Sequence, residues 1–284
     1  MPATAPSPIP SFQAHSPENC PFETVIIDIT HRCNMACRNC YIPNRQIPDL
    51  SAEWVGSMIR RLPRGTNVRF VGAEPTLHPD LPWMIAEARR SRMHPVVLSN
   101  GLRLADRAYL RELKTAGLRV MYLSLNGGFD DDLYEAIDDL RCADRKRAAL
   151  ENLRAEHMYT SLGMIIVRGV NEGEPAKVLR YIRSAPFIRE LHLRSVGAIG
   201  RHIATIEPLT LGELAGIWRR AAGGGDVATA AGPKNDSHME IRSGRLRVQL
   251  TVWPELGSSR RGRLTPEGMI EPFFEHVLQN EGGY

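Results

Sequence analysis

The alternation of strand-like and helix-like segments constrains the fold of this chain most. Short apolar runs rich in β-branched residues are typical of buried strands, and six of them are predicted, over residues 24–30, 68–71, 96–99, 120–125, 161–167 and 191–194. Helical patterns separate or follow them, over residues 51–62, 79–93, 105–116, 145–157, 174–184 and 209–222. Such alternation predicts an α/β fold with a parallel sheet, and six repeats are fewer than the eight of a closed barrel.

Three of the five cysteines lie within eight residues, directly after the first predicted strand. Cys33, Cys37 and Cys40 follow C-x₃-C-x₂-C spacing, so three thiolates on one short loop can converge on a single inorganic centre. A [4Fe–4S] cluster normally takes four cysteine ligands, and this loop lacks a fourth. One iron would then stay free for a ligand from outside the protein, and an open position distinguishes a catalytic metal site from a structural one.

A structural zinc site is the alternative for these cysteines. Zinc accepts mixed Cys and His ligands, so His31 or His15 could complete the set. Zinc-binding loops usually come as two separated pairs of ligands, and the chain contains no second pair. The sequence therefore favours the iron–sulfur cluster.

A second motif follows the second predicted strand, where residues 68–71 lead directly into Gly72-Ala73-Glu74-Pro75. With these two motifs in this order, the chain resembles the radical S-adenosylmethionine (radical SAM) enzymes, in particular the core of the molybdopterin- and peptide-maturase type. Their signature is C-x₃-C-x₂-C after the first strand and a G-G-E-P-like segment after the second. The resemblance covers approximately residues 23–200 and implies a partial (β/α)₆ TIM-like barrel.

The resemblance also implies the cofactors and the chemistry. Cys33, Cys37 and Cys40 would hold one [4Fe–4S] cluster, and SAM would chelate the iron that lacks a cysteine. One electron from the cluster would break a carbon–sulfur bond, giving a 5′-deoxyadenosyl radical that abstracts hydrogen from the substrate. The segment Gly72, Ala73, Glu74 and Pro75 would bind SAM, with Glu74 accepting charge-assisted hydrogen bonds from its ammonium.

Further SAM-binding candidates lie where predicted strands end, because barrel chemistry sits at the carboxyl ends of strands. They are Ser99, Ser124, Asn126, Arg168 and Arg194. The resemblance implies that Ser124 and Asn126 hold the ribose and methionyl groups. Arg194 suits a carboxylate, since a guanidinium binds it in bidentate fashion. Ser and Asn at strand ends also cap turns, which is the alternative for them.

Two further groups of candidate residues complete the prediction. Family members often carry an aromatic residue before the last cysteine, against the adenine of SAM; this chain has Asn39 there and Tyr41 directly after Cys40. Asn39 can hydrogen-bond an adenine edge. Cys142, between the fourth strand and its helix, is the candidate catalytic residue, because a thiol there could return a hydrogen atom to a substrate radical. The favoured alternative is a small buried side chain, the usual state of a free cysteine.

Composition limits the partners. The hydrophobic (43%) and charged (24%) fractions are close to globular averages, and no apolar stretch approaches the roughly 18 residues that span a bilayer. The net charge of +4 is too small and dispersed to indicate nucleic-acid or membrane binding. An odd number of cysteines without a disulfide framework, together with an oxygen-sensitive cluster, indicates the cytoplasm.

The domain organisation follows from these segments. Residues 1–22 are predicted to be a flexible leader, because Met1–Ser16 is rich in proline and serine and lacks the regions of a signal peptide. Residues 23–205 form the barrel. Residues 206–284 form a small C-terminal extension with one helix, a linker over 221–237, a β-hairpin over 239–252 and a second turn over 263–270. No cysteine follows Cys142, so the extension holds no auxiliary cluster and is expected to close the barrel.

The leading hypothesis is a radical SAM enzyme that acts on a small molecule by rearrangement, coupling, dehydrogenation or epimerisation. A low-potential donor such as flavodoxin or ferredoxin would supply the electron. A peptide-modifying maturase is the nearest alternative, although Met1–Pro21 is too short for a peptide-recognition domain. A non-catalytic zinc or iron–sulfur protein is the alternative from another class.

Overall fold

The computed structural model describes residues 13–38, 40, 42, 44–197, 206–224, 230–235 (backbone only), 237–252 and 261–272. Its strands form one sheet in the order β11-β10-β1-β2-β3-β4-β5-β6-β9-β8-β7. The central six are β1 (Thr24–Thr30), β2 (Asn67–Gly72), β3 (His94–Ser99), β4 (Val120–Ser124), β5 (Tyr159–Ile166) and β6 (Ile188–Ser195). They are parallel and neighbour one another in chain order, which confirms the predicted α/β fold.

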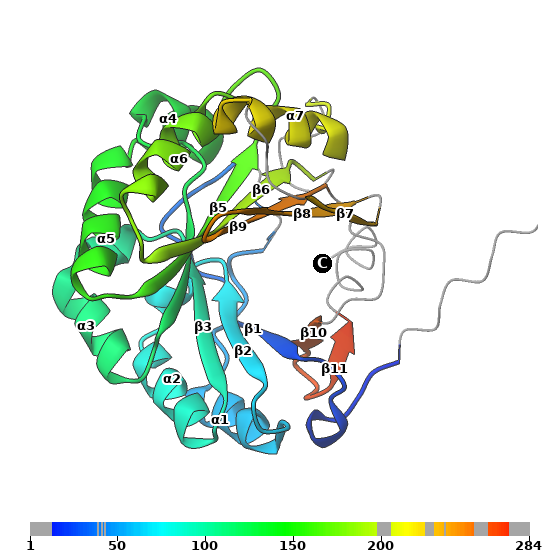
Figure 1. Ribbon diagram of the computed structural model, residues 1–284. Helices are drawn as coiled ribbons and strands as arrows, with labels where there is room; N and C mark the ends of the chain where they lie inside the picture. The colour runs from blue at the N-terminus through cyan, green and yellow to red at the C-terminus, as the bar shows by residue number, and fades with distance from the viewer. Residues whose placement is uncertain are drawn as a thin grey trace, which may run out of the picture.

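The described helices lie outside the curved sheet (Figure 1). They are α1 (Ala52–Arg61), α2 (Leu81–Arg90), α3 (Arg107–Thr115), α4 (Asp131–Asp138), α5 (Ala143–Ala155), α6 (Glu174–Arg183) and α7 (Leu211–Ala222), with 3₁₀ turns η1 (Pro17–Asn19), η2 (Pro75–Leu77) and η3 (Leu102–Ala105). Local signals explain where they begin. The Ser51 side chain accepts a hydrogen bond from Trp54 N at the start of α1, and Thr210 with Glu213 forms a capping box in α7. No helix in the described ranges is both long and apolar enough to span a membrane.

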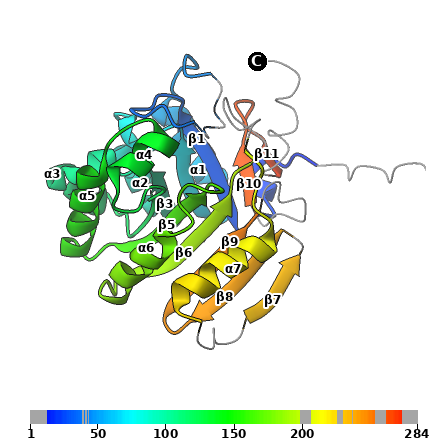
Figure 2. The same ribbon diagram turned by 90° about the horizontal axis from the view of Figure 1, so that it is seen from above.

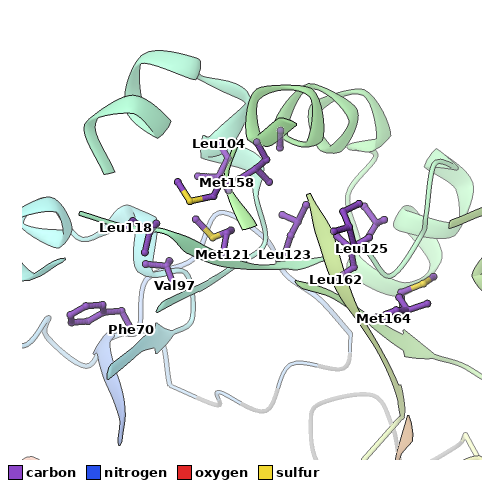
Figure 3. Packing of buried hydrophobic residues seen from close by; sticks show 14 of the residues in the cluster. Phe70, Val97, Leu104, Leu118, Met121, Leu123, Leu125, Met158, Leu162 and Met164 are labelled. Atoms are coloured by element: carbon purple, nitrogen blue, oxygen red, sulfur yellow. The ribbon is translucent and has the colours of Figure 1, made fainter. Parts of the chain in front are cut away.

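The core lies between the helices and one face of the sheet. Alternate strand residues such as Ile27, Phe70 and Val97 are fully buried there, because successive strand side chains point to opposite faces. Figure 3 shows Phe70, Val97, Met121 and Leu162 in this layer beside Leu104. Burial of each such side chain contributes roughly 1.5–3 kcal/mol to the stability of the fold. The packed face therefore holds the strands in place, and the site is built on the ends of these strands.

The C-terminal segments add strands to both edges of the sheet. β9 (Leu246–Thr251) lies parallel to β6 and continues through β8 (His238–Ser243) to β7 (Ala230–Asn235). β10 (Arg261–Leu264) lies parallel to β1 and pairs with β11 (Ile270–Pro272). The two groups form opposite ends of the strand order, and Figure 2 shows both on the side of the molecule away from α3. The predicted hairpin and second turn are confirmed.

Two predictions of local structure were incomplete or wrong. The linker predicted over 221–237 is wrong for Ala230–Asn235, which forms β7, because pairing with β8 overrides the weak strand propensity of its Ala, Gly and Pro residues. Helix α4 was not predicted. Asp130 accepts hydrogen bonds from Asp132 N and Leu133 N, an N-cap that the run of three aspartates before an apolar segment encodes.

Glu156, at the C-terminal end of α5, joins this helix to α3. Its carboxylate accepts hydrogen bonds from Arg111 Nε (2.9 Å), Arg107 Nε (2.8 Å) and Lys114 Nζ (3.3 Å). The hydrogen bonds from Arg111 and Arg107 lower the pKa of Glu156 from 4.5 to about 2. A carboxylate with a depressed pKa stabilises the folded state above its unfolded pKa, and this contribution is lost as the pH falls through the folded pKa.

We therefore expect Glu156→Gln to weaken the acid dependence of stability. In the wild type, part of the stability is lost as the pH falls from 4.5 towards 2, whereas the glutamine has no charge to lose. Urea unfolding midpoints measured between about pH 7 and pH 3 test this. Glu112→Gln, at an exposed position of α3, is the matched control. Parallel midpoint profiles for wild type and Glu156→Gln contradict the expectation.

Candidate functional site

The cysteine loop follows β1 and is held by backbone hydrogen bonds. Cys40 N donates to Cys37 O (3.2 Å), which closes a tight turn between two of the candidate ligands. Arg38 N donates to Ile137 O (3.1 Å), so the loop is attached to the last turn of α4. Cys33, Cys37 and Cys40 are all free thiols of intermediate exposure, which suits side chains that present sulfur to a bound group.

The donor set of this loop fits an iron–sulfur cluster. Burial raises the pKa of the Cys37 thiol, and the charges of Asp138, Cys33 and Cys40 raise it further, so the three sulfurs lie within electrostatic range of one another. The loop offers three such thiols, and thiolates are the usual ligands of iron–sulfur clusters.

Arg45 contacts this loop from the chain segment that follows it. Its Nη2 donates to Cys40 Sγ (3.0 Å), and Cys33 lies within hydrogen-bonding reach. A guanidinium here places positive charge beside the thiolates that a cluster requires. Arg45 belongs to neither motif, so no pattern in the sequence points to it.

The Gly72–Pro75 segment binds to the start of the cysteine loop through its backbone. Ala73 N donates to Thr30 O (2.9 Å) and Glu74 N to Arg32 O (3.0 Å). Gly72 has φ +126°, and a Cβ there would lie 2.1 Å from Thr30 O, so only glycine fits. The close approach at Gly72 is to the end of β1, and this contact fixes the two motifs against each other.

Glu74 ties the ends of β2 and β3 together. Its carboxylate is 0% exposed and accepts hydrogen bonds from Thr76 N (3.1 Å), Thr76 Oγ1 (2.6 Å), Ser99 Oγ (2.8 Å) and Asn100 N (2.7 Å). Burial raises the pKa of Glu74, and these hydrogen bonds lower it. The predicted contact with the SAM ammonium stays a prediction.

Asn100 carries this network to the cysteine loop. Its Nδ2 donates to Asn34 Oδ1 (2.8 Å) and lies 3.9 Å from Cys33 Sγ. Its carbonyl oxygen accepts a hydrogen bond from Lys146 Nζ (2.5 Å), which also donates to Ser124 O (2.9 Å). The Lys146 side chain from α5 therefore joins the ends of β3 and β4, and the Asn100 side chain links them to the cysteine loop.

Asn126 forms a second network at the end of β4. Its Nδ2 donates to Asp138 Oδ1 (3.0 Å), and its Oδ1 accepts from Ile165 N (2.9 Å). Asn171 Nδ2 donates to Asn126 O (2.8 Å). Asp138, 1% exposed, is also a hydrogen-bond neighbour of Cys37. Asn126 thus reaches the cysteine loop through Asp138, a residue that the sequence analysis missed because α4 was missed.

The remaining predicted SAM ligands lie in different surroundings. Ser124 is exposed at the end of β4. Arg194 donates from Nε to His192 Nδ1 (3.2 Å). Arg168 makes a bidentate pair with Glu213 at the start of α7, with distances of 2.7 and 3.0 Å. Asn39 and Tyr41 lie outside the described residues. SAM contacts by these side chains stay predictions.

Cys142 lies on the helix side of the sheet. It is 4% exposed and belongs to the hydrophobic core at the start of α5. Burial raises the pKa of its thiol, so the side chain stays protonated. We expect Cys142→Ala to destabilise the fold by roughly 1 kcal/mol and to leave SAM cleavage and product formation unchanged. Urea unfolding and turnover of the reconstituted protein measure both, and loss of product with retained SAM cleavage would support hydrogen return by Cys142.

The arrangement of the two motifs agrees with comparisons to known proteins. The model of the radical SAM superfamily matches residues 27–182, more than half of the chain. The chain belongs to the radical SAM superfamily. It is therefore an enzyme of the kind that uses a [4Fe–4S] cluster and SAM. The structure places three free thiols beside a Gly-x-Glu-Pro segment that is hydrogen-bonded to the start of their loop.

The relatives of this radical SAM enzyme differ in what they act on. The 7,8-dihydro-6-hydroxymethylpterin dimethyltransferase of Methanocaldococcus jannaschii is 30% identical over 186 residues, 62% of this chain and 36% of that protein. The PqqA peptide cyclase of Gluconobacter oxydans is 30% identical over 151 residues, 51% of this chain and 42% of that enzyme. This chain thus spans less than half the length of both. SuiB of Streptococcus suis bound to S-adenosylmethionine has the same fold, with a TM-score of 0.66 and 13% identity over 89% of this chain and 61% of SuiB.

Proposed function

We propose that this radical SAM enzyme cleaves SAM reductively and uses the 5′-deoxyadenosyl radical to abstract hydrogen from a small-molecule substrate. A cluster held by Cys33, Cys37 and Cys40 supplies an electron and an open iron position for SAM. The observation that carries the proposal is the attachment of the Gly72–Glu74 segment to the cysteine loop through Thr30 O and Arg32 O. This attachment brings the two motifs to the same end of the sheet.

The chain's own residues then have distinct tasks. The three thiolates bind the cluster, and Arg45 donates a hydrogen bond to one of the sulfurs. Glu74 and Asn100 fix the loops at the ends of β2 and β3, so that SAM meets a rigid backbone. Ser124, Asn126, Arg168 and Arg194 remain the proposed SAM-binding side chains, with Asn39 and Tyr41 for the adenine.

The surrounding parts of the chain have proposed roles as well. The strands of the segment 206–284 pair with both β1 and β6, which supports an extension that closes the open sides of the barrel without an auxiliary cluster. Residues 1–22 are proposed as a leader. A low-potential protein such as flavodoxin or ferredoxin is the proposed electron donor, and the cytoplasm the proposed location.

Anaerobic reconstitution tests the proposed function. We expect about four irons per chain, a change in the electron paramagnetic resonance spectrum of the reduced cluster on addition of SAM, and formation of 5′-deoxyadenosine with dithionite. Protein that contains zinc in place of iron, or iron whose spectrum does not respond to SAM, contradicts the proposal.

A peptide-modifying maturase is the second candidate, favoured by the match to the PqqA peptide cyclase. The two candidates differ in what receives the radical. Deuterium from a labelled substrate appears in 5′-deoxyadenosine only when that substrate is the hydrogen donor. Transfer from a labelled peptide, with none from small-molecule extracts, would favour the maturase.

Arg45 provides a separate test of the cluster site. Hydrogen bonds to cluster sulfurs and local charge raise the reduction potential, so we expect Arg45→Met to lower the midpoint potential by tens of millivolts while iron content is unchanged. Redox titration followed by electron paramagnetic resonance measures this shift. Arg64→Met, at an exposed position outside both motifs, is the control, and an unchanged potential in Arg45→Met would contradict a contact with the cluster.

A further inference from the structure

The inner face of the sheet, opposite the helices, is rich in charged side chains. Alternation along the strands puts Arg69, Tyr122 and His192 on this face, while their neighbours Phe70, Met121 and Leu193 belong to the core. Arg69 on β2 contacts Tyr122 on β4, although β3 lies between these strands, so the face is concave and its side chains converge. The helix face is apolar, and this face is not.

Two arginines of the inner face have carboxylate partners. Arg263 Nε on β10 lies 2.6 Å from Asp28 Oδ2 on β1, and Arg247 Nε on β9 donates to Glu190 Oε2 on β6 (2.9 Å). These pairs join the added strands to the central sheet. Their charges are matched, so they leave no positive charge for a ligand.

Arg69 differs from them. Its only hydrogen bond in the described part of the chain runs from Nη2 to Tyr122 Oη at 3.5 Å, and its Cζ lies 5.0 Å from the Tyr122 ring centroid. Its Nε is buried and has no hydrogen-bond partner. No carboxylate of the described residues pairs with it, and a buried charge without an opposite charge is costly.

Burial is the main influence on the charge of Arg69. It lowers the pKa of Arg69; the charges of Arg261 and Arg247 lower this pKa further, and Tyr122 and Glu190 raise it. Burial also lowers the pKa of His192 well below its ordinary value, with Arg194, Arg261, His238 and Arg69 adding to the effect. His192 is therefore neutral. A neutral His192 adds no charge beside Arg69, and an anion bound to the Arg69 guanidinium would be stabilised by it.

The inner face is open at Gly163, in the middle of β5. A Cβ there would meet no atom of the described residues within 4 Å. Gly163 lies in register with Ser124 on β4 and His192 on β6, on the carboxyl-terminal side of Tyr122. A bound molecule can therefore approach the β5 backbone between the cysteine end of the sheet and Arg69.

We propose that Arg69, with the Tyr122 hydroxyl, binds an oxyanion of the substrate, a phosphate or a carboxylate, on the inner face of the sheet. A planar guanidinium, here with its Nε donor unpartnered among the described residues, matches either group in bidentate fashion. Arg69 lies three residues before Gly72, about 10 Å along the strand from the motif that meets the cysteine loop. The inference rests on the proposed function, since it names the class of substrate: an anionic small molecule whose charged group lies deep in the barrel.

Calorimetric titration of inorganic phosphate into the reconstituted, SAM-saturated protein tests this site. SAM fills the open iron position and the site for its own carboxylate, so the titration reports phosphate binding at a separate site. We expect Arg69→Gln to weaken phosphate binding at least tenfold, Arg69→Lys to weaken it less, and Tyr122→Phe to weaken it a few-fold. Acetate in a parallel titration distinguishes a carboxylate site from a phosphate site. Arg64→Gln is the matched control and should bind as wild type does.

The contradicting results are distinct from those of the proposed function. Three results would overturn the inference. The first is equal phosphate affinity in wild type and in both Arg69 variants, and the second is no binding of either anion to wild type. The third is phosphate binding to apo protein that SAM displaces. Circular dichroism verifies folding, and Arg69→Lys provides a folded variant if Arg69→Gln is unstable. The titration needs no reductant, so wild type that binds phosphate through Arg69 but does not cleave SAM contradicts the proposed function alone.

Discussion

Replacement of any one of Cys33, Cys37 and Cys40 by alanine is expected to abolish 5′-deoxyadenosine formation. A [4Fe–4S] cluster with an open iron position already has only three protein ligands, and two thiols do not hold it. We expect the iron content after reconstitution to fall to the background level and SAM cleavage to fall below detection in all three variants. Iron analysis, visible absorption and chromatography of the reaction mixture measure these losses.

The same variants should fold. The three thiols have intermediate exposure, and Cys33 and Cys37 pack against the edge of the core, so each substitution should cost about 0.5–3 kcal/mol, the usual range for a point mutation. Cys20→Ala is the matched control, because Cys20 is a free thiol that lies in the core, away from the loop. It should bind iron and cleave SAM as wild type does. Retained cleavage in all three loop variants would contradict the assignment.

The two motifs were predictable because each is contiguous. The runs around Ile27 and Phe70 have the pattern of buried strands, and each motif follows its strand within a few residues. Strand order then brings the motifs together, since adjacent parallel strands place their carboxyl ends side by side. The sequence accordingly predicted the fold class, which the structure confirms. It also predicted the cysteine loop and the Gly72–Pro75 segment as site residues; the structure brings these two motifs together, and their roles stay predictions.

Residues that act across the fold were not predictable in the same way. Asp138 meets Cys37 only because α4 folds back to the cysteine loop, and Arg45 belongs to neither motif. Arg69 is one polar residue in an apolar strand, and nothing in the sequence says that Tyr122 converges with it. The parallel pairing of β10 with β1 and of β9 with β6 likewise depends on long-range packing.

Glu74→Gln is expected to produce the largest effect of any single-atom change in the Gly72–Pro75 segment. The carboxylate accepts hydrogen bonds on both oxygens: three on Oε1 from Thr76 and Ser99, and one on Oε2 from Asn100 N. A glutamine amide must place an NH₂ group against one of these donors. A buried donor left without an acceptor costs roughly 1–3 kcal/mol, and more where a charge is involved.

The expected consequences extend from stability to cofactor binding. Because Asn100 joins Glu74 to Asn34 in the cysteine loop, a displaced Asn100 should loosen that loop, so we expect a lower free energy of unfolding together with reduced iron content and weaker SAM binding. Urea unfolding, iron analysis and SAM titration of the reconstituted protein measure the three effects. Glu112→Gln, the same change at an exposed position of α3, should alter none of them. A Glu74→Gln protein with wild-type stability and SAM affinity would show that the buried carboxylate does not organise the site. The backbone contacts of Gly72 and Ala73 would then be what holds the ends of β2 and β3.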